Sequence, residues 1–380
     1  MDVKTFVERI RNLEIEHIAG VPDSTLKYFC DYLNYQESCS FQHHVTANEG
    51  AAVGIAAGIY LSTGKPACIY MQNSGIGNAV NPIVSLLNEK VYAIPALIII
   101  GWRGQPGVKD EPQHIFQGEI TTDFCNVMNI SYGIIGKDTG SQDVDRVFAE
   151  AKETLIQGKQ YAIIIRQDTF KPCNSIENIN HYSLIREEAI AEIIRCSRPE
   201  DVIVSTTGKI SREVYTQSDL IRNNHNQNFL TVGSMGHASM IALGIALSKQ
   251  EKKVICMDGD GAVLMHMGAL PMIAKYNLGN FIHIVLNNEA HESVGGMPTC
   301  AAGVSIAEVA KASGYKEAYC VEDIDSLKKA FEQAYSSQNA VLIEVKVSLF
   351  SRKDLIRPKE SAVENKQNFM KFHHFLEHKR

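Results

Sequence analysis

The second half of the chain contains the stretch VICMDGDGAVLMHMGALPMIAKYNLGNFIHIVLNN, residues 254–288. Its two ends, 254–257 and 281–286, are apolar runs, the second with a single polar residue at His283, which is typical of strands buried on both faces of a parallel sheet. Residues 268–276 between them have the spacing of a helix, so the stretch predicts a strand, a crossover helix and a second parallel strand. A Gly-Asp-Gly motif follows the first strand, and an Asn-Asn motif follows the second.

Both motifs therefore stand at the carboxyl ends of strands, where open α/β sheets bind ligands. Glycines leave backbone N–H groups free to face a phosphate, and Asp260 and Asn288 offer the oxygen ligands that Mg²⁺ prefers. An Asp-Gly-Asp-Gly sequence could also open a calcium loop, but Ala269 stands where that loop needs a bidentate Glu. A plain tight turn is the other alternative. The pairing of the two motifs favours a site for a phosphate and a divalent cation.

The alternation of strand and helix extends over the whole chain, which predicts an α/β fold with parallel sheets. Further strands are predicted at 17–22, 66–71, 96–100, 161–166, 201–205 and 341–347, and further helices at 3–13, 47–61, 77–87, 210–219 and 240–248. The polar stretch at 168–185 interrupts the pattern. We therefore expect two doubly wound domains, at 1–170 and 185–380.

The composition is that of an ordinary globular protein, with 45% hydrophobic and 21% charged residues among 380. A net charge of −6 gives no support for a nucleic-acid partner, and the basic tail at 350–380 is expected to be a solvated helix face. Nine cysteines without a C-x-x-C pair predict reduced thiols in a cytoplasmic protein. No signal peptide is expected, because the chain reaches Glu8, Arg9 and Arg11 without an apolar h-region, and no membrane span is expected, because the longest apolar run is about 10 residues.

The Gly-Asp-Gly and Asn-Asn motifs, at this separation, resemble the thiamine-diphosphate fingerprint of the 2-oxoacid decarboxylases and their relatives. The resemblance implies a Mg²⁺ held by Asp260, Asn288 and the backbone oxygen of Ala290. It also implies that the cofactor's diphosphate lies against Gly259, Asp260, Gly261, Ala262 and Asn288.

Two other segments agree with this family. The family has a glutamate at the start of a helix near residue fifty, and Glu49 fits; it would be catalytic, hydrogen-bonding the aminopyrimidine ring of the cofactor. The segment Gly233-Ser234-Met235-Gly236 would contact the cofactor. The carbonyl of Gly233 would accept a hydrogen bond from the pyrimidine amino group, and Met235 would pack as a wedge beneath the cofactor. Without the resemblance, Glu49 is a partner for the helix dipole and Met235 a core residue.

The resemblance implies two thiamine-diphosphate-binding domains, a pyrimidine-binding one at 1–170 and a diphosphate-binding one at 185–380, without the middle domain of larger relatives. Segments 20–24, 288–299 and 351–355 resemble phosphonopyruvate decarboxylases, which implies conversion of 3-phosphonopyruvate to phosphonoacetaldehyde and CO₂ in phosphonate biosynthesis. Pyruvate decarboxylases carry a catalytic Glu about where Val294 stands. This departure argues against pyruvate as substrate and leaves the late proton donor open.

A substrate with a carboxylate and a phosphonate needs fixed cations and N–H donors. His114 lies in a segment that resembles the place where pyruvate decarboxylases keep active-site histidines, and we expect it to move protons in catalysis. Lys209 is a candidate cation at a strand end. The candidate substrate-binding residues are Asp23, Ser24, Arg103, Lys109, His291, Ser293 and Arg352.

Three alternatives stay open. Sulfopyruvate differs from phosphonopyruvate in charge and not grossly in shape, although many sulfopyruvate enzymes consist of two separate chains. A carboligase would differ only in the product that leaves. A non-catalytic nucleotide-binding protein could use Gly75-Ile76-Gly77, but Val80 replaces the third glycine of G-x-G-x-x-G. The family's site lies between the first domain of one chain and the second of another, so at least a dimer is implied.

Overall fold

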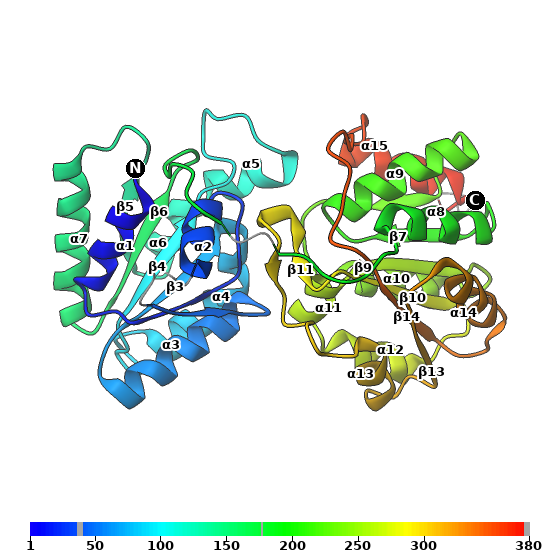
Figure 1. Cartoon of the computed structure of the whole chain (residues 1–380), viewed down its shortest axis with the longest axis horizontal. Coiled ribbons are helices and arrows are strands. Elements are labelled where there is room, and N and C mark those ends of the chain that lie inside the picture. The colour runs from blue at the N-terminus through cyan, green and yellow to red at the C-terminus, as the bar shows by residue number, and fades with distance from the viewer. Residues whose placement is uncertain (36–40, 176–177, 376–380) are drawn as a thin grey trace, which may run out of the picture. The chain divides into compact units, whose positions relative to one another are not determined.

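The computed structural model describes residues 1–35, 41–175 and 178–375, apart from the side chain of Ser293. The chain divides into two compact units (Figure 1). The first comprises Met1–Glu177 with Val294–Met297, and the second comprises Asn178–Ser293 with Pro298–Arg380. Each is built around one six-stranded parallel sheet, which confirms the predicted fold class.

The sheet of the first unit has the strand order β2-β1-β3-β4-β6-β5, and all neighbouring strands are parallel. Its strands are β1 (His17–Gly20), β2 (Gln42–Val45), β3 (Ala67–Gln72), β4 (Ala96–Gly101), β5 (Ser131–Ile135) and β6 (Gln160–Ile165). Successive side chains of a strand point to opposite faces. β3 therefore sends Cys68 and Tyr70 into one hydrophobic core, and Ile69 and Met71 into the other.

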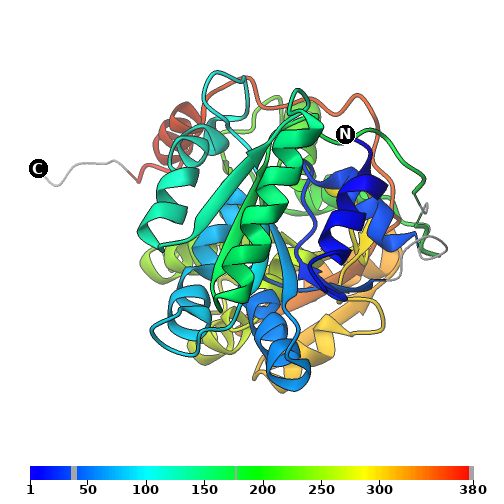
Figure 2. The same cartoon turned by 90° about the vertical axis from the view of Figure 1, so that its left-hand side faces the viewer.

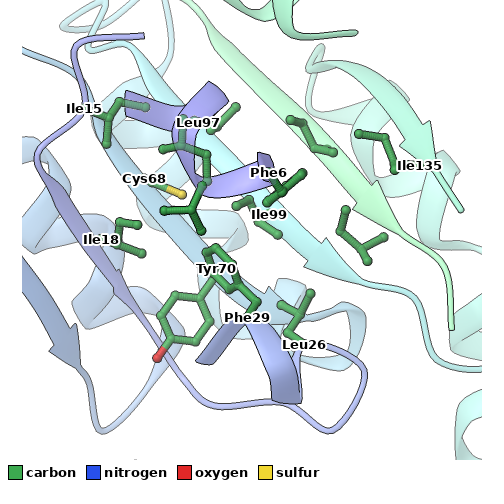
Figure 3. Close-up of a cluster of buried hydrophobic side chains, with 14 of the residues drawn as sticks. Phe6, Ile15, Ile18, Leu26, Phe29, Cys68, Tyr70, Leu97, Ile99 and Ile135 are labelled. Carbon is green, nitrogen blue, oxygen red and sulfur yellow. The ribbon is translucent and has the colours of Figure 1, made fainter. Parts of the chain in front are cut away.

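Helices cover both faces of this sheet (Figure 2). They are α1 (Val3–Arg11), α2 (Lys27–Asn34), α3 (Glu49–Thr63), α4 (Ile76–Pro82), α5 (Pro112–Glu119), α6 (Thr121–Val127) and α7 (Ser141–Ile156), with the short turns η1 (Asn73–Gly75) and η2 (Ile83–Leu87). Phe6 of α1 and Phe29 of α2 pack edge to face beside Tyr70 (Figure 3). Burying each such side chain, rather than leaving it exposed to water, stabilises the fold by about 1.5–3 kcal/mol.

The sheet of the second unit has the order β13-β14-β10-β9-β7-β8, again all parallel. Its strands are β7 (Val202–Ser205), β8 (Asn228–Leu230), β9 (Val254–Gly259), β10 (Phe281–Asn287), β13 (Glu317–Val321) and β14 (Val341–Lys346), and a separate pair is formed by β11 (Ala290–His291) and β12 (Met297–Pro298). Its helices are α8 (Arg186–Cys196), α9 (Lys209–Arg222), α10 (Ala238–Ser248), α11 (Asp260–Met265), α12 (Ala269–Tyr276), α13 (Ile306–Ala312), α14 (Ile324–Ser336) and α15 (Ala362–Phe372), with the turn η3 (Glu292–Val294).

Every strand predicted from the sequence overlaps a strand of the structure, whereas β2, β5, β8, β13 and the short pair β11 and β12 were not predicted. The helix expected at 77–87 is α4 followed by the π-helical turn η2, and the change comes at Pro82, which has no N–H to continue the α-helical ladder. The basic tail is also more than a solvated face. Its helix α15 buries Phe369, and Asn365 accepts a hydrogen bond from the Leu230 backbone.

Two expectations about cysteines and membranes can be compared with the structure. The cysteines that the structure describes are all free. No described helix combines the length and the apolar character that crossing a membrane requires.

Candidate active site

Glu49 begins helix α3, directly after the capping residue Asn48, whose side chain accepts a hydrogen bond from the Ala51 backbone. The Glu49 side chain is buried, with 5% of its surface exposed. Nδ2 of Asn78 donates a hydrogen bond to Glu49 Oε2 at 2.8 Å. Burial raises the pKa of Glu49, and the hydrogen bond from Asn78 offsets this only in part. Glu49 is therefore a better proton acceptor than an exposed glutamate.

Gly75 makes room for the Glu49 carboxylate. It lies in the turn η1 after β3, and a Cβ atom at this position would stand 2.2 Å from Glu49 Oε1. Real Cβ atoms essentially never come this close, so a side chain at 75 would displace the carboxylate. Gly75 was considered above as part of a nucleotide-binding loop. The structure instead gives it the role of a spacer under Glu49.

We expect Gly75→Ala to lower kcat by about 10²-fold or more, because a shift of about 1 Å in a reacting group can cost this much. Steady-state turnover of a 2-oxoacid checks this result. Gly77→Ala is the matched control, since a Cβ at Gly77 meets no atom within 4 Å and α4 should tolerate it. Equal turnover in the two variants would contradict the role of Gly75.

Asp23 and Ser24 follow β1, whose carboxyl end lies beside that of β3. Asp23 is 1% exposed and accepts hydrogen bonds from the backbone N–H groups of Thr25 and Leu26 and from Gln72 Nε2. Burial raises the pKa of Asp23, although these hydrogen bonds lower it in part. Asp23 thus fixes the turn after β1 and places the neighbouring Ser24 at the same edge of the sheet.

Arg103 and Lys109 both lie in the loop after β4, but in different environments. Arg103 donates through Nε and Nη2 to the two carboxylate oxygens of Asp110, and through Nη1 to Ser24 Oγ. Although partial burial raises it, the pKa of Asp110 is held well below its usual range by the hydrogen bonds from Arg103 and from backbone N–H groups. Lys109 is exposed. An anion that binds Arg103 would therefore compete with Asp110.

His114 lies in the first turn of α5, and its Nδ1 is buried without a hydrogen-bond partner among the described residues. Burial, together with the nearby charge of Arg103, lowers the pKa of His114 to about 4. The imidazole is therefore neutral at pH 7, and it can accept a proton. Gly104 and Gly118 hold the loop against α5, because a Cβ at Gly104 would stand 1.8 Å from the His114 carbonyl oxygen.

In the second unit, Asp260 begins α11 directly after β9. The carboxylate is 4% exposed, and Oδ2 accepts a hydrogen bond from Thr299 Oγ1. Burial raises the pKa of Asp260 to about 6, and the bond from Thr299 lowers it only in part. Backbone N–H groups of Asp260 and Gly261 also lower this pKa, but they do not offset the effect of burial. Such a buried carboxylate is stabilised by a cation that binds beside it.

Asn288 stands at the end of β10, which pairs with β9 so that Leu286 lies opposite Gly259. The two predicted motifs therefore lie at neighbouring strand ends, as the sequence indicated. Asn288 Oδ1 accepts a hydrogen bond from the Ala290 N–H, and Nδ2 donates to Glu292 Oε2. This Asx turn brings Ala290 back towards the side chain of Asn288.

The segment 233–236 forms a loop in which Gly233, Ser234 and Gly236 have positive φ angles of 72°, 47° and 84°. The Gly233 N–H donates a hydrogen bond to Thr207 Oγ1 at 3.0 Å. A Cβ at Gly261 would stand 3.3 Å from the terminal methyl carbon of Met235. The loop thus brings Met235 next to the Gly-Asp-Gly motif, from 26 positions earlier in the chain.

His291 faces the same motif, since a Cβ at Gly261 would also lie 3.5 Å from its Cε1 atom. Burial lowers the pKa of His291 to about 4, so that the ring is neutral at pH 7. Arg352 lies apart from this motif in its contacts, because it pairs with Glu187 and Asp354. The side chain of Ser293 lies outside the described part of the structure.

Glu292 connects several of these groups and was not among the residues selected from the sequence. Besides Asn288, its carboxylate accepts hydrogen bonds from Arg186 Nη1 and from Lys209 Nζ at 3.0 Å. Arg186 is itself buried and forms a two-pronged ion pair with Glu213. Although burial raises it, the pKa of Glu292 is lowered by Arg186 and Lys209. Glu292 thus links a candidate metal ligand to two cations.

Both halves of the chain match models of the same kind of enzyme. Residues 3–127 match the thiamine pyrophosphate enzyme, N-terminal TPP binding domain, and residues 207–345 match the thiamine pyrophosphate enzyme, C-terminal TPP binding domain. The chain is 34% identical to a phosphonopyruvate decarboxylase of Streptomyces viridochromogenes, over 96% of this chain and 93% of that protein. The chain belongs to the thiamine-diphosphate-dependent decarboxylases.

As a member of this family, which the sequence motifs indicated, the protein is a carboxy-lyase whose two domains bind thiamine diphosphate. Two further proteins are similar to this decarboxylase over most of its length. A phosphonopyruvate decarboxylase of Streptomyces hygroscopicus is 33% identical, over 96% of this chain and 92% of that protein. A sulfopyruvate decarboxylase of Methanosarcina acetivorans is 29% identical, over 89% of both chains.

Proposed function

We propose that this enzyme decarboxylates 3-phosphonopyruvate to phosphonoacetaldehyde and CO₂, with thiamine diphosphate and Mg²⁺. The observation that carries the proposal is the similarity to phosphonopyruvate decarboxylases over nearly the whole of both chains. Among the candidate cations Arg103, Lys109, Lys209 and Arg352, all of which the structure describes, Lys109 has no ion-pair partner. It is therefore available to a phosphonate without first releasing a carboxylate.

The residues fit both the cofactor and the metal. Asp260 is a buried carboxylate with a raised pKa, so a divalent cation beside it would offset the cost of its burial. We assign Asp260, Asn288 and the backbone oxygen of Ala290 as its ligands. The glycine at 261 leaves the space between Met235 and His291 free of a side chain, as the approach of a cofactor requires.

When bound, thiamine diphosphate supplies a nucleophilic carbon and accepts the electron pair that departing CO₂ leaves. In this proposal, Glu49 exchanges a proton with the pyrimidine ring through its buried carboxyl group, and Asn78 and Gly75 keep that group in place. Met235 would support the cofactor, and the Gly233 carbonyl oxygen would accept a hydrogen bond from the amino group of the pyrimidine ring. His114, which is neutral at pH 7, moves a proton at Nδ1 or Nε2 near the substrate.

We expect kcat/KM for 3-phosphonopyruvate to exceed that for sulfopyruvate and for pyruvate by about 10²-fold or more. Pyruvate has no second anionic group to pair with Lys109, and sulfopyruvate carries less charge than 3-phosphonopyruvate. Parallel steady-state assays, with identification of the product, check this. Faster turnover of sulfopyruvate would overturn the substrate assignment, and a condensed product would indicate a carboligase.

Sulfopyruvate remains the second candidate, because the relative from Methanosarcina is also a single chain. The fusion of both halves in one chain, which the sequence argument held against sulfopyruvate, therefore does not separate the two substrates. The two candidate substrates differ in carrying a phosphonate or a sulfonate beside the keto acid, so the assays above decide between them.

We also propose that the enzyme works at least as a dimer, with each site completed by a second chain. In support, three large apolar side chains of the first unit are exposed, namely Ile55 and Leu61 of α3, at 37% and 71%, and Tyr92, at 66%. A Cβ at Gly54 or Gly58 of α3 would meet open space. Light scattering on the eluted protein should give at least twice the mass of 42.1 kDa, and a monomeric mass for active enzyme would contradict the proposal.

A further inference from the structure

Cys256, Asp258 and His283 form a cluster inside the second unit that the proposed reaction does not use. All three are at most 1% exposed, and their ligand-type atoms lie within 4.8 Å of one another. Cys256 and His283 are paired in the register of β9 and β10. Asp258 stands two positions after Cys256 and so on the same face of β9.

Two polar atoms in this cluster have no hydrogen-bond partner among the described residues. They are Asp258 Oδ2 and His283 Nε2, which lie 3.6 Å apart. This separation is longer than an N–H···O hydrogen bond of about 2.7–3.2 Å. It is close to the spacing of about 3.3 Å between two ligands at 2.0–2.1 Å from one tetrahedral zinc ion. The two atoms are thus spaced as ligands of a shared cation.

The second oxygen of Asp258 and the second ring nitrogen of His283 contact other groups, which leaves Oδ2 and Nε2 to bind a metal ion. Asp258 Oδ1 accepts a hydrogen bond from the Gly259 N–H at 3.0 Å. His283 Nδ1 lies 3.4 Å from the hydroxyl of Tyr315, which is buried. If Nδ1 carries the proton and donates to Tyr315, Nε2 keeps its lone pair free, as in metal-bound histidines with an outer hydrogen-bond partner.

We propose that Cys256, Asp258 and His283 bind a zinc ion that is distinct from the Mg²⁺ held at Asp260. A Cys-Asp-His donor set with one sulfur ligand selects zinc over Mg²⁺, which takes oxygen ligands. Binding releases the thiol proton and forms a Zn–S bond of about 2.3 Å. Because Asp258 stands two residues before Asp260, the ion fixes the end of β9 from which the magnesium ligand extends.

The test is the zinc content of the full-length enzyme, produced in zinc-supplemented medium and desalted into chelator-treated buffer. Elemental analysis should find about one zinc ion per chain in the unmodified enzyme. Cys256→Ser and His283→Gln should each lower this content at least fivefold. Cys68→Ser is the matched control, because Cys68 is equally buried in a central strand of the other sheet, and its zinc content should be unchanged.

Asp260→Asn separates this site from the magnesium site, since the variant should keep its zinc while losing magnesium-dependent cofactor binding. If the cysteine and histidine variants do not fold, production of the unmodified enzyme with Co²⁺ still tests the proposal through thiolate-to-cobalt absorption in the near ultraviolet. Zinc below about one-tenth of an ion per chain, no such absorption, or equal zinc in Cys256→Ser and unmodified enzyme would overturn it.

Discussion

Replacing Glu49 by Gln lowers kcat by an expected 10²- to 10⁴-fold, about the contribution of a positioned proton-transfer group. Gln has the same shape, and its carbonyl oxygen can still accept the hydrogen bond from Asn78 Nδ2. It cannot take up or give a proton at this position. The loss should therefore appear in kcat, measured with saturating cofactor and 3-phosphonopyruvate, while the thermal shift caused by the cofactor is retained.

Glu16→Gln is the control for this substitution. Glu16 is exposed and pairs with Lys65 on the surface, so its removal should leave kcat within about twofold of the unmodified enzyme. Comparable activity in Glu49→Gln and Glu16→Gln would remove Glu49 from the reaction. A lost cofactor shift in Glu49→Gln would instead assign Glu49 to cofactor binding alone.

Replacing Asp260 by Ala should abolish magnesium-dependent binding of thiamine diphosphate. The unmodified enzyme should gain about 2.7 kcal/mol of stability when the cofactor is present at one hundred times its Kd. The variant loses the carboxylate that we propose as the ligand of the cation, so the same concentrations should give no shift in Tm. Thermal unfolding, with and without cofactor and Mg²⁺, measures this difference.

The matched control is Asp325→Asn in helix α14, where the side chain is exposed in the first turn. Its removal costs at most a few tenths of a kcal/mol through the helix dipole, and the cofactor shift should stay intact. A full shift in Asp260→Ala would contradict the metal assignment. A shift lost in both variants would mean that the effect is not specific to Asp260.

The central strands could be predicted because burial on both faces favours a nearly continuous apolar run, as β4 shows. β2 could not, since its sequence QHHV is polar and its residues are exposed or half-buried. It is an edge strand that forms by pairing with β1 alone, from His17 opposite Gln42 to Gly20 opposite Val45. The pairing with β1 depends on residues distant in the chain, so the sequence of β2 itself does not predict it.

In the candidate site, too, some residues could be predicted from the sequence and others could not. Asp260 and Asn288 follow strands directly, so periodicity alone placed them at one edge of the sheet. Glu292 was missed because its partners Arg186 and Lys209 stand 106 and 83 positions earlier in the chain. Asn78 was missed for a similar reason, since it meets Glu49 only where two helices pack together.

The contact between Gly104 and Gly118 bears on how substrate preference can change among related enzymes. At both positions the backbone of one segment occupies the place of the other's Cβ, at 1.8 Å and 1.7 Å. An insertion or deletion between Gly104 and Gly118 would break this close contact between the two backbone segments. We therefore expect new specificities to arise here by exchange of single side chains, such as Lys109, at constant loop length.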